Sequence, residues 1–336
     1  MNTPATLFHA DPAVMDERSD DSSRSSSPTI EDGLFFIVGA PRSGTTLLQT
    51  ILSRHTRLHI PPETEFFMSY GQETLDRLGF DRYIRAFLAS QRWKDQGLRD
   101  SELRAELNRS ARSRPTARDV FLAMMALHAR KQAKPRIGEK SPHHCRSVRA
   151  ILAAFPDARI IHLVRDPRDV VASRLRMPWS RGSHLAVARE WRRIIEHHLE
   201  LRRELPPATY LELRYESLAQ DPESSARLLC NFLGESFEPA MLAASSTSPT
   251  FAPREAEWKA NAAGAVHTAS IASYRSQLTP RQIAGIQRET AAAMSAVGYA
   301  PDAVQPESSW AFADFKDRCR DAVGKFSRSL RKHTGR

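Results

Sequence analysis

The chain has 336 residues, of which 41% are hydrophobic and 26% charged, and its formal net charge is +10. This length is enough for one large core or two smaller domains. The sequence contains no run of eighteen apolar residues, which excludes an ordinary transmembrane helix. The first 32 residues lack the basic-then-apolar order of a secretory signal. Three scattered cysteines fit a reducing compartment better than a disulfide framework or a zinc site, so we expect a soluble, cytoplasmic protein.

The positive charge is unevenly distributed along the chain. Residues 1–32 hold seven acids and two arginines, whereas residues 310–336 hold eight Lys or Arg and three Asp. The part between them is therefore strongly basic. A basic body suits an anionic ligand, an acidic macromolecule or nucleic acid, and charge alone does not choose among them.

Three regions are expected in chain order. Residues 1–32 are polar, acidic and serine-rich, which is typical of a disordered arm. Residues 33–300 form the folded domain, which opens with "LFFIV" (34–38), a short apolar run that predicts a buried strand. Residues 301–336 form a basic amphipathic tail, which packs on its own domain or a partner, or makes peripheral contact with an anionic membrane.

Strands and helices alternate through most of the domain. A helix is predicted at 45–54, further buried strands at 158–166 and 208–218, and a capped helix at 222–234. This alternation predicts an α/β fold with a parallel sheet flanked by helices. Residues 66–135 instead contain amphipathic helices with no strand between them. We interpret this segment as a helical insertion over the carboxyl edge of the sheet, where ligands bind in open α/β folds.

The segment between the first strand and its helix has the features of a phosphate-binding loop. The predicted loop residues are Gly39, Arg42, Ser43, Gly44, Thr45 and Thr46. The glycines permit a tight turn, the hydroxyls can donate hydrogen bonds, and the helix N-terminus attracts an anion. Arginine adds a planar cation. The alternative is an ordinary strand-to-helix turn with its arginine at the surface.

This loop differs from the loop of ATP- and GTP-binding proteins. Those proteins carry Lys-Ser or Lys-Thr after the second glycine, to reach the β- and γ-phosphates and to hold Mg²⁺. Here Thr45 and Thr46 occupy those positions. The strand at 158–166 ends near Arg165 rather than in a clear magnesium-binding aspartate, although Asp166 is adjacent. The loop is therefore suited to a phosphate without a metal beside it.

Two motifs of the sequence resemble those of the PAPS-dependent sulfotransferases. "PRSGTT" (41–46) matches the loop that binds the 5′-phosphosulfate in that family. "RDPRDVVAS" places Ser173 eight residues after Arg165, the spacing of the family's 3′-phosphate ligands. The resemblance runs from about residue 34 to 299 and implies a P-loop-like fold, PAPS as the sulfuryl donor and no metal.

Further segments resemble the tyrosylprotein sulfotransferases and related bacterial enzymes. By motif, "PPETEFF" gives Glu63 as the catalytic base, and "GEKSP" gives Lys140 as a cation on the transferring group. "LRYESLAQDP" gives Tyr215 as a strand residue that touches the cofactor, and Arg42 joins the catalytic set. An additional family cation is either Arg174 or Arg176. In the segment 250–276, Lys259 and Ser270 are plausible site residues without a settled register.

Four residues receive a structural interpretation from the sequence. His143 and His144 have no third metal ligand at a useful spacing, so we expect them to cap or pack on the helix that follows. Arg168 and Asp169 are expected to be surface residues of a first helical turn.

The expected reaction is sulfuryl transfer from PAPS to an acceptor hydroxyl. A peptide tyrosine, a glycan, a lipid and a small molecule all remain open as acceptors, and a homodimer remains open. A P-loop kinase, a nucleotide-binding module without turnover and a nucleic-acid-binding protein are the alternatives. The missing Lys-Ser/Thr pair disfavours the kinase. Nucleic acid is not expected, because the few aromatic residues are not interleaved with basic ones.

Overall fold

The protein was analysed as a computed structural model. It describes residues 33–109, 114–180, 182–243, 251 and 266–304, together with residues 310, 313, 315–317, 319 and 321. The expected arm at 1–32, Lys259 and most of the basic tail lie outside these described residues.

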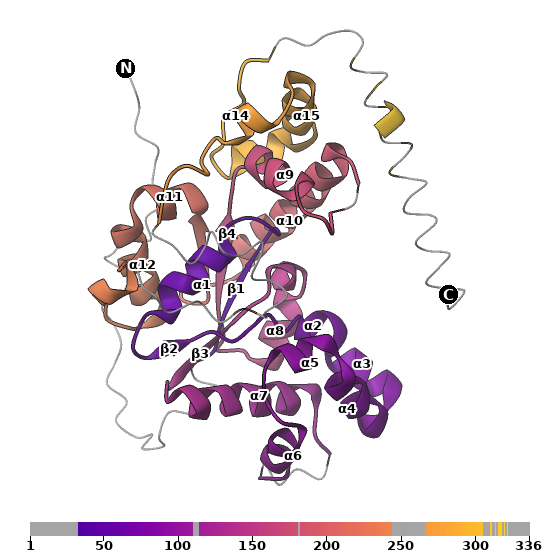
Figure 1. Ribbon diagram of the computed structural model, residues 1–336, viewed down its shortest axis with the longest axis vertical. Helices are drawn as coiled ribbons and strands as arrows, with labels where there is room; N and C mark the ends of the chain where they lie inside the picture. Colours follow the sequence, from indigo (N-terminus) through magenta and orange to yellow (C-terminus); the bar gives the residue numbers. More distant parts are fainter. Residues whose placement is uncertain are drawn as a thin grey trace.

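A five-stranded parallel sheet forms the centre of the described chain, with the strand order β2-β3-β1-β4-β5 (Figure 1). The strands are β1 (Phe35–Gly39), β2 (Leu58–His59), β3 (Arg136–Lys140), β4 (Arg159–Val164) and β5 (Tyr210–Arg214). In the register of β1, Phe35 lies opposite Gly138 of β3 and Arg159 of β4. Because all strands are parallel, their carboxyl ends meet along one edge of the sheet. The predicted parallel α/β fold is confirmed.

Helices cover both faces of the sheet and therefore bury β1 on both sides. Alternate side chains of β1 enter two different core clusters, Phe36 and Val38 in one and Phe35 and Ile37 in the other. The second cluster is closed by α1 (Thr45–Ser53), α11 (Tyr215–Gln220) and α12 (Pro222–Leu233). The first is closed by α7 (Ala117–Gln132), α8 (Val148–Ala154) and α10 (His184–Glu204).

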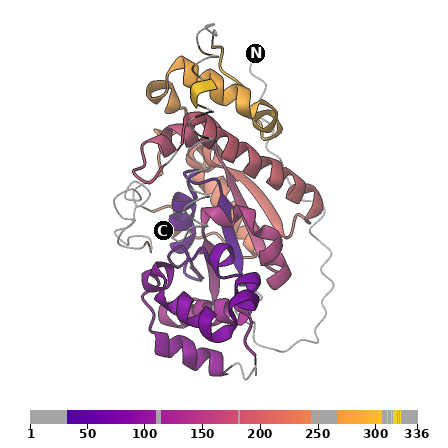
Figure 2. The same ribbon diagram turned by 90° about the vertical axis from the view of Figure 1, so that its right-hand side faces the viewer.

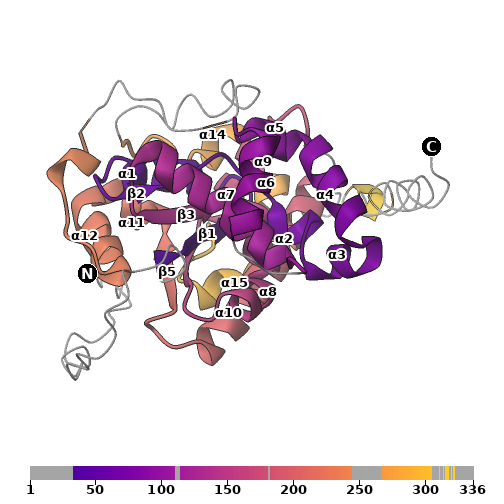
Figure 3. The same cartoon turned by 90° about the horizontal axis from the view of Figure 1, so that it is seen from below.

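Six helices and no strand occupy the chain between β2 and β3 within the described residues. They are α2 (Phe66–Ser69), α3 (Gln72–Leu78), α4 (Phe80–Ala89), α5 (Gln91–Asp95), α6 (Asp100–Arg109) and α7. A capping box of Thr116 and Asp119 starts α7. Figure 2 shows these helices at one end of the molecule, and Figure 3 shows α3 and α4 on the opposite side from α12.

Two strands of the sheet have no clear signal in the sequence. Strand β2 is two residues long, and β3 reads "RIGEK", with three charged residues out of five. Glu139 and Lys140 are nevertheless completely buried. Local hydrophobicity predicts strands that are buried in an apolar core. It does not predict a strand such as β3, whose buried charged side chains are paired with residues elsewhere in the chain.

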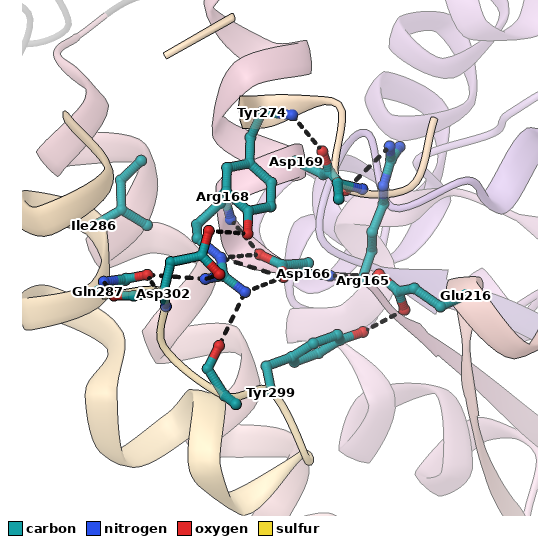
Figure 4. Close-up of polar contacts among 12 residues, drawn as sticks. Arg165, Asp166, Arg168, Asp169, Glu216, Tyr274, Ile286, Gln287, Tyr299 and Asp302 are labelled. Atoms are coloured by element: carbon teal, nitrogen blue, oxygen red, sulfur yellow. Dashed lines mark hydrogen bonds and ion pairs between the residues drawn. The ribbon is translucent and has the colours of Figure 1, made fainter. Parts of the chain in front are cut away.

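The C-terminal part of the domain packs on α9 (Pro167–Leu175) and α10. It comprises α14 (Tyr274–Gln277) and α15 (Pro280–Ala296). Arg168 lies at the centre of this contact, where it pairs with Asp166, donates to Gln287 Oε1 at 2.8 Å and lies 4.5 Å from the ring centre of Tyr274 (Figure 4). Arg168 and Asp169 are only 4% and 1% exposed, so the expectation of surface residues was wrong. The pattern of a polar first helical turn does not reveal that another helix will cover it.

The described residues of the tail also contact the domain. Asp321 accepts hydrogen bonds from the backbone N–H and the hydroxyl of Ser183, at 2.9 and 2.6 Å, and from Arg189 at 3.1 Å. Asp317 accepts one from Arg281 at 2.5 Å. The tail therefore contacts its own domain through the carboxylates of Asp317 and Asp321.

Candidate active site

The predicted phosphate loop connects β1 to α1 at the carboxyl edge of the sheet. Gly44, the N-cap of α1, has a left-handed backbone with φ of 95°, and no side chain caps the helix. A Cβ atom at Gly44 would lie 2.4 Å from a ring atom of Tyr215, so only glycine fits there. Tyr215 therefore packs against the loop, and it is the first residue of α11 rather than a strand residue.

The loop contains one buried hydroxyl without a hydrogen-bond partner among the described residues. Ser43 is completely buried, and its hydroxyl has no hydrogen-bond partner among the described residues. Thr45 is buried and Thr46 partly exposed at the start of α1. Arg42 has φ of 75°, an uncommon conformation for a residue with a side chain. A buried hydroxyl without a partner is costly, and an anion bound in the loop would supply an acceptor.

The two predicted phosphate-binding motifs lie side by side. Arg42 Nε donates to Ser173 Oγ at 3.1 Å, although the two residues are 131 positions apart. Burial, together with the positive charges of Arg165, Arg176 and Arg174, lowers the pKa of Arg42, and the carboxylate of Glu63 acts in the opposite direction. Both candidate extra cations therefore act on Arg42. Such crowding of cations is favourable when an anion binds among them.

Arg165 links the loop to the segment around residue 270. It donates to the carbonyl of Arg42 at 3.2 Å and to the carbonyl of Ser270 at 2.6 Å, and its guanidinium lies 4.3 Å from the ring centre of Tyr215. Asp169, one helical turn later, lies 3.9 Å from Arg165 (Figure 4). Ser270 therefore reaches this site through its backbone carbonyl.

Asp169 holds the turn that follows Ser270. It accepts hydrogen bonds from the backbone N–H groups of Ala272 and Tyr274 and from the hydroxyl of Ser273, each at 2.9 Å. Burial raises the pKa of this carboxyl, and the charge of Arg165 and these hydrogen bonds counteract the shift. Sequence reasoning missed Asp169 as a site-supporting residue, and its only signal was the i, i+4 spacing from Arg165.

Glu63 and Lys140 form a buried ion pair at the same edge of the sheet. Lys140 Nζ donates to Glu63 Oε1, across 77 positions of sequence. The Lys140 side chain is 0% and the Glu63 side chain 10% exposed. Glu63 follows β2 and Lys140 ends β3, so the adjacency of these two strands brings the pair together. The structure thus joins two residues that the sequence motifs predicted separately.

A second polar group lies beside Glu63. Glu65 pairs with Arg92 of α5 at 2.5 Å and with His143 Nδ1 at 3.5 Å. Although burial acts to raise the pKa of Glu65, its contacts with His143 and Arg92 lower it to about 2. His143 is partly exposed, whereas His144 is completely buried. Among the described residues, no three His, Cys, Asp or Glu side chains are grouped as metal ligands would be.

Comparison with known protein families identifies the family of this chain. Residues 35–239, which include the predicted loop, Glu63, Lys140, Arg165, Ser173 and Tyr215 but not Lys259 or Ser270, match the sulfotransferase family. The chain belongs to this family.

Curated relatives of this chain are named for different acceptors. It is 25% identical to a protein-tyrosine sulfotransferase of Drosophila melanogaster, over 71% of this chain and 47% of the relative. It is 26% identical to the omega-hydroxy-beta-dihydromenaquinone-9 sulfotransferase of Mycobacterium tuberculosis, over 63% of this chain and 65% of the relative. An uncharacterised protein of Aquifex aeolicus is 28% identical over 59% of this chain. The match spans 25% of that relative and about half of the Drosophila enzyme.

Solved structures support the fold. The sulfotransferase domain of the Synechococcus PCC 7002 olefin synthase has a TM-score of 0.58 and 25% identity, covering 80% of this chain and 95% of that domain. The sulfotransferase domain from the curacin biosynthetic pathway has a TM-score of 0.59 and 20% identity, covering 82% of this chain and all of that domain. In the described part of the sulfotransferase, no helix has the length and apolar character needed to cross a bilayer.

Proposed function

We propose that this protein transfers a sulfuryl group from PAPS to an acceptor hydroxyl. The observation that carries the proposal is the contact between Arg42 and Ser173, which merges two motifs for phosphate into one cationic site. A nucleotide with phosphates at both its 5′ and 3′ positions would use both motifs at once. The unpartnered hydroxyl of Ser43 suits the same ligand.

In this proposal the 5′-phosphosulfate lies in the loop at the N-terminus of α1. The loop N–H groups and the hydroxyls of Ser43, Thr45 and Thr46 would hold its oxygens, because helix N-termini bind anions. Gly44 would allow its close approach. Arg165 and Ser173 would hold the 3′-phosphate, and Tyr215 would border the nucleotide.

The chemical step is a direct in-line transfer. The bond between sulfur and the 5′-phosphate oxygen breaks, a bond between sulfur and the acceptor oxygen forms, and the acceptor proton passes to Glu63. Arg42 and Lys140 would stabilise the negative charge that grows on the leaving phosphate and the sulfuryl oxygens. Pairing with Lys140 would hold the carboxylate of Glu63 in place at this edge of the sheet. Proton removal by such a base typically contributes ~10²–10⁴-fold.

A tyrosine hydroxyl in a peptide is the first acceptor to test, because several relatives are named as protein-tyrosine sulfotransferases. A lipid hydroxyl is the second, because another relative is named for an omega-hydroxylated menaquinone. Glycans and small phenols share the same reactive group. The location of the protein is proposed as cytoplasmic, and a homodimer and membrane contact by the tail remain proposals.

The experiment that tests this function combines binding and turnover. Calorimetry should show that adenosine 3′,5′-bisphosphate binds about 10–150-fold more tightly than 5′-AMP, the equivalent of one charge-assisted contact. Incubation with ³⁵S-labelled PAPS and a panel of tyrosine peptides, hydroxylated lipids, glycans and phenols should label one acceptor class without added metal. Equal affinity for the two nucleotides, together with no labelled acceptor, would contradict the proposal.

A further inference from the structure

One buried carboxylate, that of Glu139, accepts four hydrogen bonds beside the proposed catalytic pair. Its Oε1 accepts from the backbone N–H of Thr64 at 3.2 Å, from the Thr64 hydroxyl at 2.8 Å and from the Ser141 hydroxyl at 2.5 Å. Its Oε2 contacts His144 Nδ1 at 2.7 Å. Glu139 and Ser141 are completely buried, as is His144.

The three side chains that contact Glu139 also bind the backbone that follows Thr64. The N–H groups of residues 65, 66 and 67 donate to Ser141 Oγ, Thr64 Oγ1 and His144 Nε2 at 2.9, 3.2 and 3.2 Å. Four consecutive backbone N–H groups, 64 to 67, are therefore held by Glu139 directly or through one side chain. These include the first N–H groups of α2, which lack partners within the helix.

The direction of each hydrogen bond follows from this pattern. A backbone N–H can only donate, so His144 Nε2 is an acceptor in its contact with residue 67. The proton of the ring is then on Nδ1, which donates to Glu139. In the same way the hydroxyls of Thr64 and Ser141 accept from the backbone and donate to the carboxylate. Each of the three side chains therefore accepts from the backbone and donates its own proton to Glu139.

The network joins the two segments that carry the catalytic pair. Glu63 immediately precedes Thr64, and Lys140 immediately follows Glu139. Glu65, within the same segment, has a left-handed backbone with φ of 48°, which a residue with a side chain adopts only where its surroundings impose it. A buried polar group needs partners, but any nearby donors would meet that need. Here the donors come from both segments of the pair: Thr64 follows Glu63, and Ser141 and His144 follow Lys140.

We propose that Glu139 is a positioning residue that holds Glu63 and Lys140 in register for transfer, with Thr64, Ser141 and His144 as its relays. The inference rests on the proposed function, because it assigns a purpose to the geometry of that site. Neither Glu139 nor its relays need to touch the nucleotide. Weakening the network should therefore reduce turnover and leave nucleotide affinity unchanged.

The first test is the pair Thr64→Val and Thr64→Ser. Valine keeps the shape of threonine but removes the donor to Glu139 and the acceptor for residue 66, whereas serine keeps both. Thr290→Val is the matched control, because Thr290 is also fully buried and its hydroxyl donates to Ile286 O at 2.7 Å in α15. We expect Thr64→Val to lower kcat about tenfold or more, since displacement of a catalytic group by ~1 Å can cost 10²-fold. Thr64→Ser should recover most of this loss, and Thr290→Val should match the unmodified enzyme.

Nucleotide binding provides the readout that separates positioning from general damage. Thr64→Val should bind adenosine 3′,5′-bisphosphate with unchanged affinity and a KM for PAPS within about twofold of the unmodified enzyme. Two results would overturn the inference while the proposed function stands: an unchanged kcat in Thr64→Val, or a fall in kcat in Thr64→Ser as large as that in Thr64→Val. A loss of nucleotide affinity that accompanies the loss of kcat would also overturn it.

A second measurement does not depend on activity. Imidazole ¹⁵N shifts of His144 should show a protonated Nδ1 and an unprotonated Nε2 in the unmodified enzyme, with the Nδ1 signal altered in Glu139→Gln. A ring protonated on Nε2 would overturn the network itself. If the unmodified enzyme transfers no sulfuryl group, the proposed function fails, and the assigned purpose of Glu139 fails with it.

Discussion

Replacing Arg165 by alanine should remove the preference for a 3′-phosphate. Besides the 3′-phosphate contact that we propose for it, the guanidinium of Arg165 donates to the carbonyls of Arg42 and Ser270, so the two roles can be separated. If it binds the 3′-phosphate, the lost charge-assisted contact is about 1.5–3 kcal/mol, which corresponds to ~10–150-fold in the affinity for adenosine 3′,5′-bisphosphate. 5′-AMP has no phosphate at that position, so its affinity should change by less than about threefold.

The assay is calorimetric titration of both nucleotides into the same protein preparation. The ratio of the two dissociation constants is the informative quantity, because a distorted loop would weaken both nucleotides equally. Arg214→Ala is the matched control. Arg214 is the last residue of β5, whereas Arg165 directly follows β4. Like Arg165, Arg214 lies near a tyrosine ring, 4.2 Å from the ring centre of Tyr299, and donates to a carbonyl, that of Gly298. It should leave the ratio unchanged. Equal weakening of both nucleotides in Arg165→Ala would show that the arginine only supports the loop, and would refute the reasoning.

Three further predictions address catalysis and stability. Glu63→Gln should keep nucleotide affinity and lose ~10²-fold or more in kcat with loss of the acidic limb of the pH–rate profile, and a near-normal rate would remove it as the base. Arg42→Ala should lower kcat by a larger factor than it raises KM, whereas a rise in KM alone would make Arg42 a ground-state anchor. Burial, with nearby positive charge, lowers the pKa of His59 to about 4 and that of His128 to about 3. Below about pH 6.5, the unperturbed pKa of histidine, the unfolded chain therefore binds more protons than the folded chain. Urea titrations should show the free energy of unfolding falling from about pH 6.5 toward pH 4, by up to ~1.4 kcal/mol per pH unit for each histidine. A slope that is the same in His128→Gln would contradict this assignment.

The local sequence predicted the candidate phosphate-binding residues and the most apolar strands. The phosphate loop that we propose at 41–46 was evident in the sequence, because binding one anion requires a glycine, hydroxyls and a cation close together in the chain. Arg165 and Ser173 are similarly a local pair, separated by about two turns of α9. Buried strands with apolar runs, such as β1 and β4, were also evident, as was the end of α12 at Gly234.

Only the tertiary structure decided which charged residues are buried and what they contact. Strand β3 has a polar sequence, yet the order β2-β3-β1-β4-β5 places it inside the sheet, between β2 and β1. There Lys140 contacts Glu63, and Glu139 accepts hydrogen bonds from two segments. Arg168 and Asp169 look like an exposed helical turn until α14 and α15 cover them. The physical reason is that a buried charge is stable only through its partners, and some of these lie far away in sequence: Lys140 and Glu63 are 77 positions apart, and Glu139 and Thr64 are 75 positions apart. Residue order specified the groups that can bind and react, and chain packing decided which of them hold the others in place.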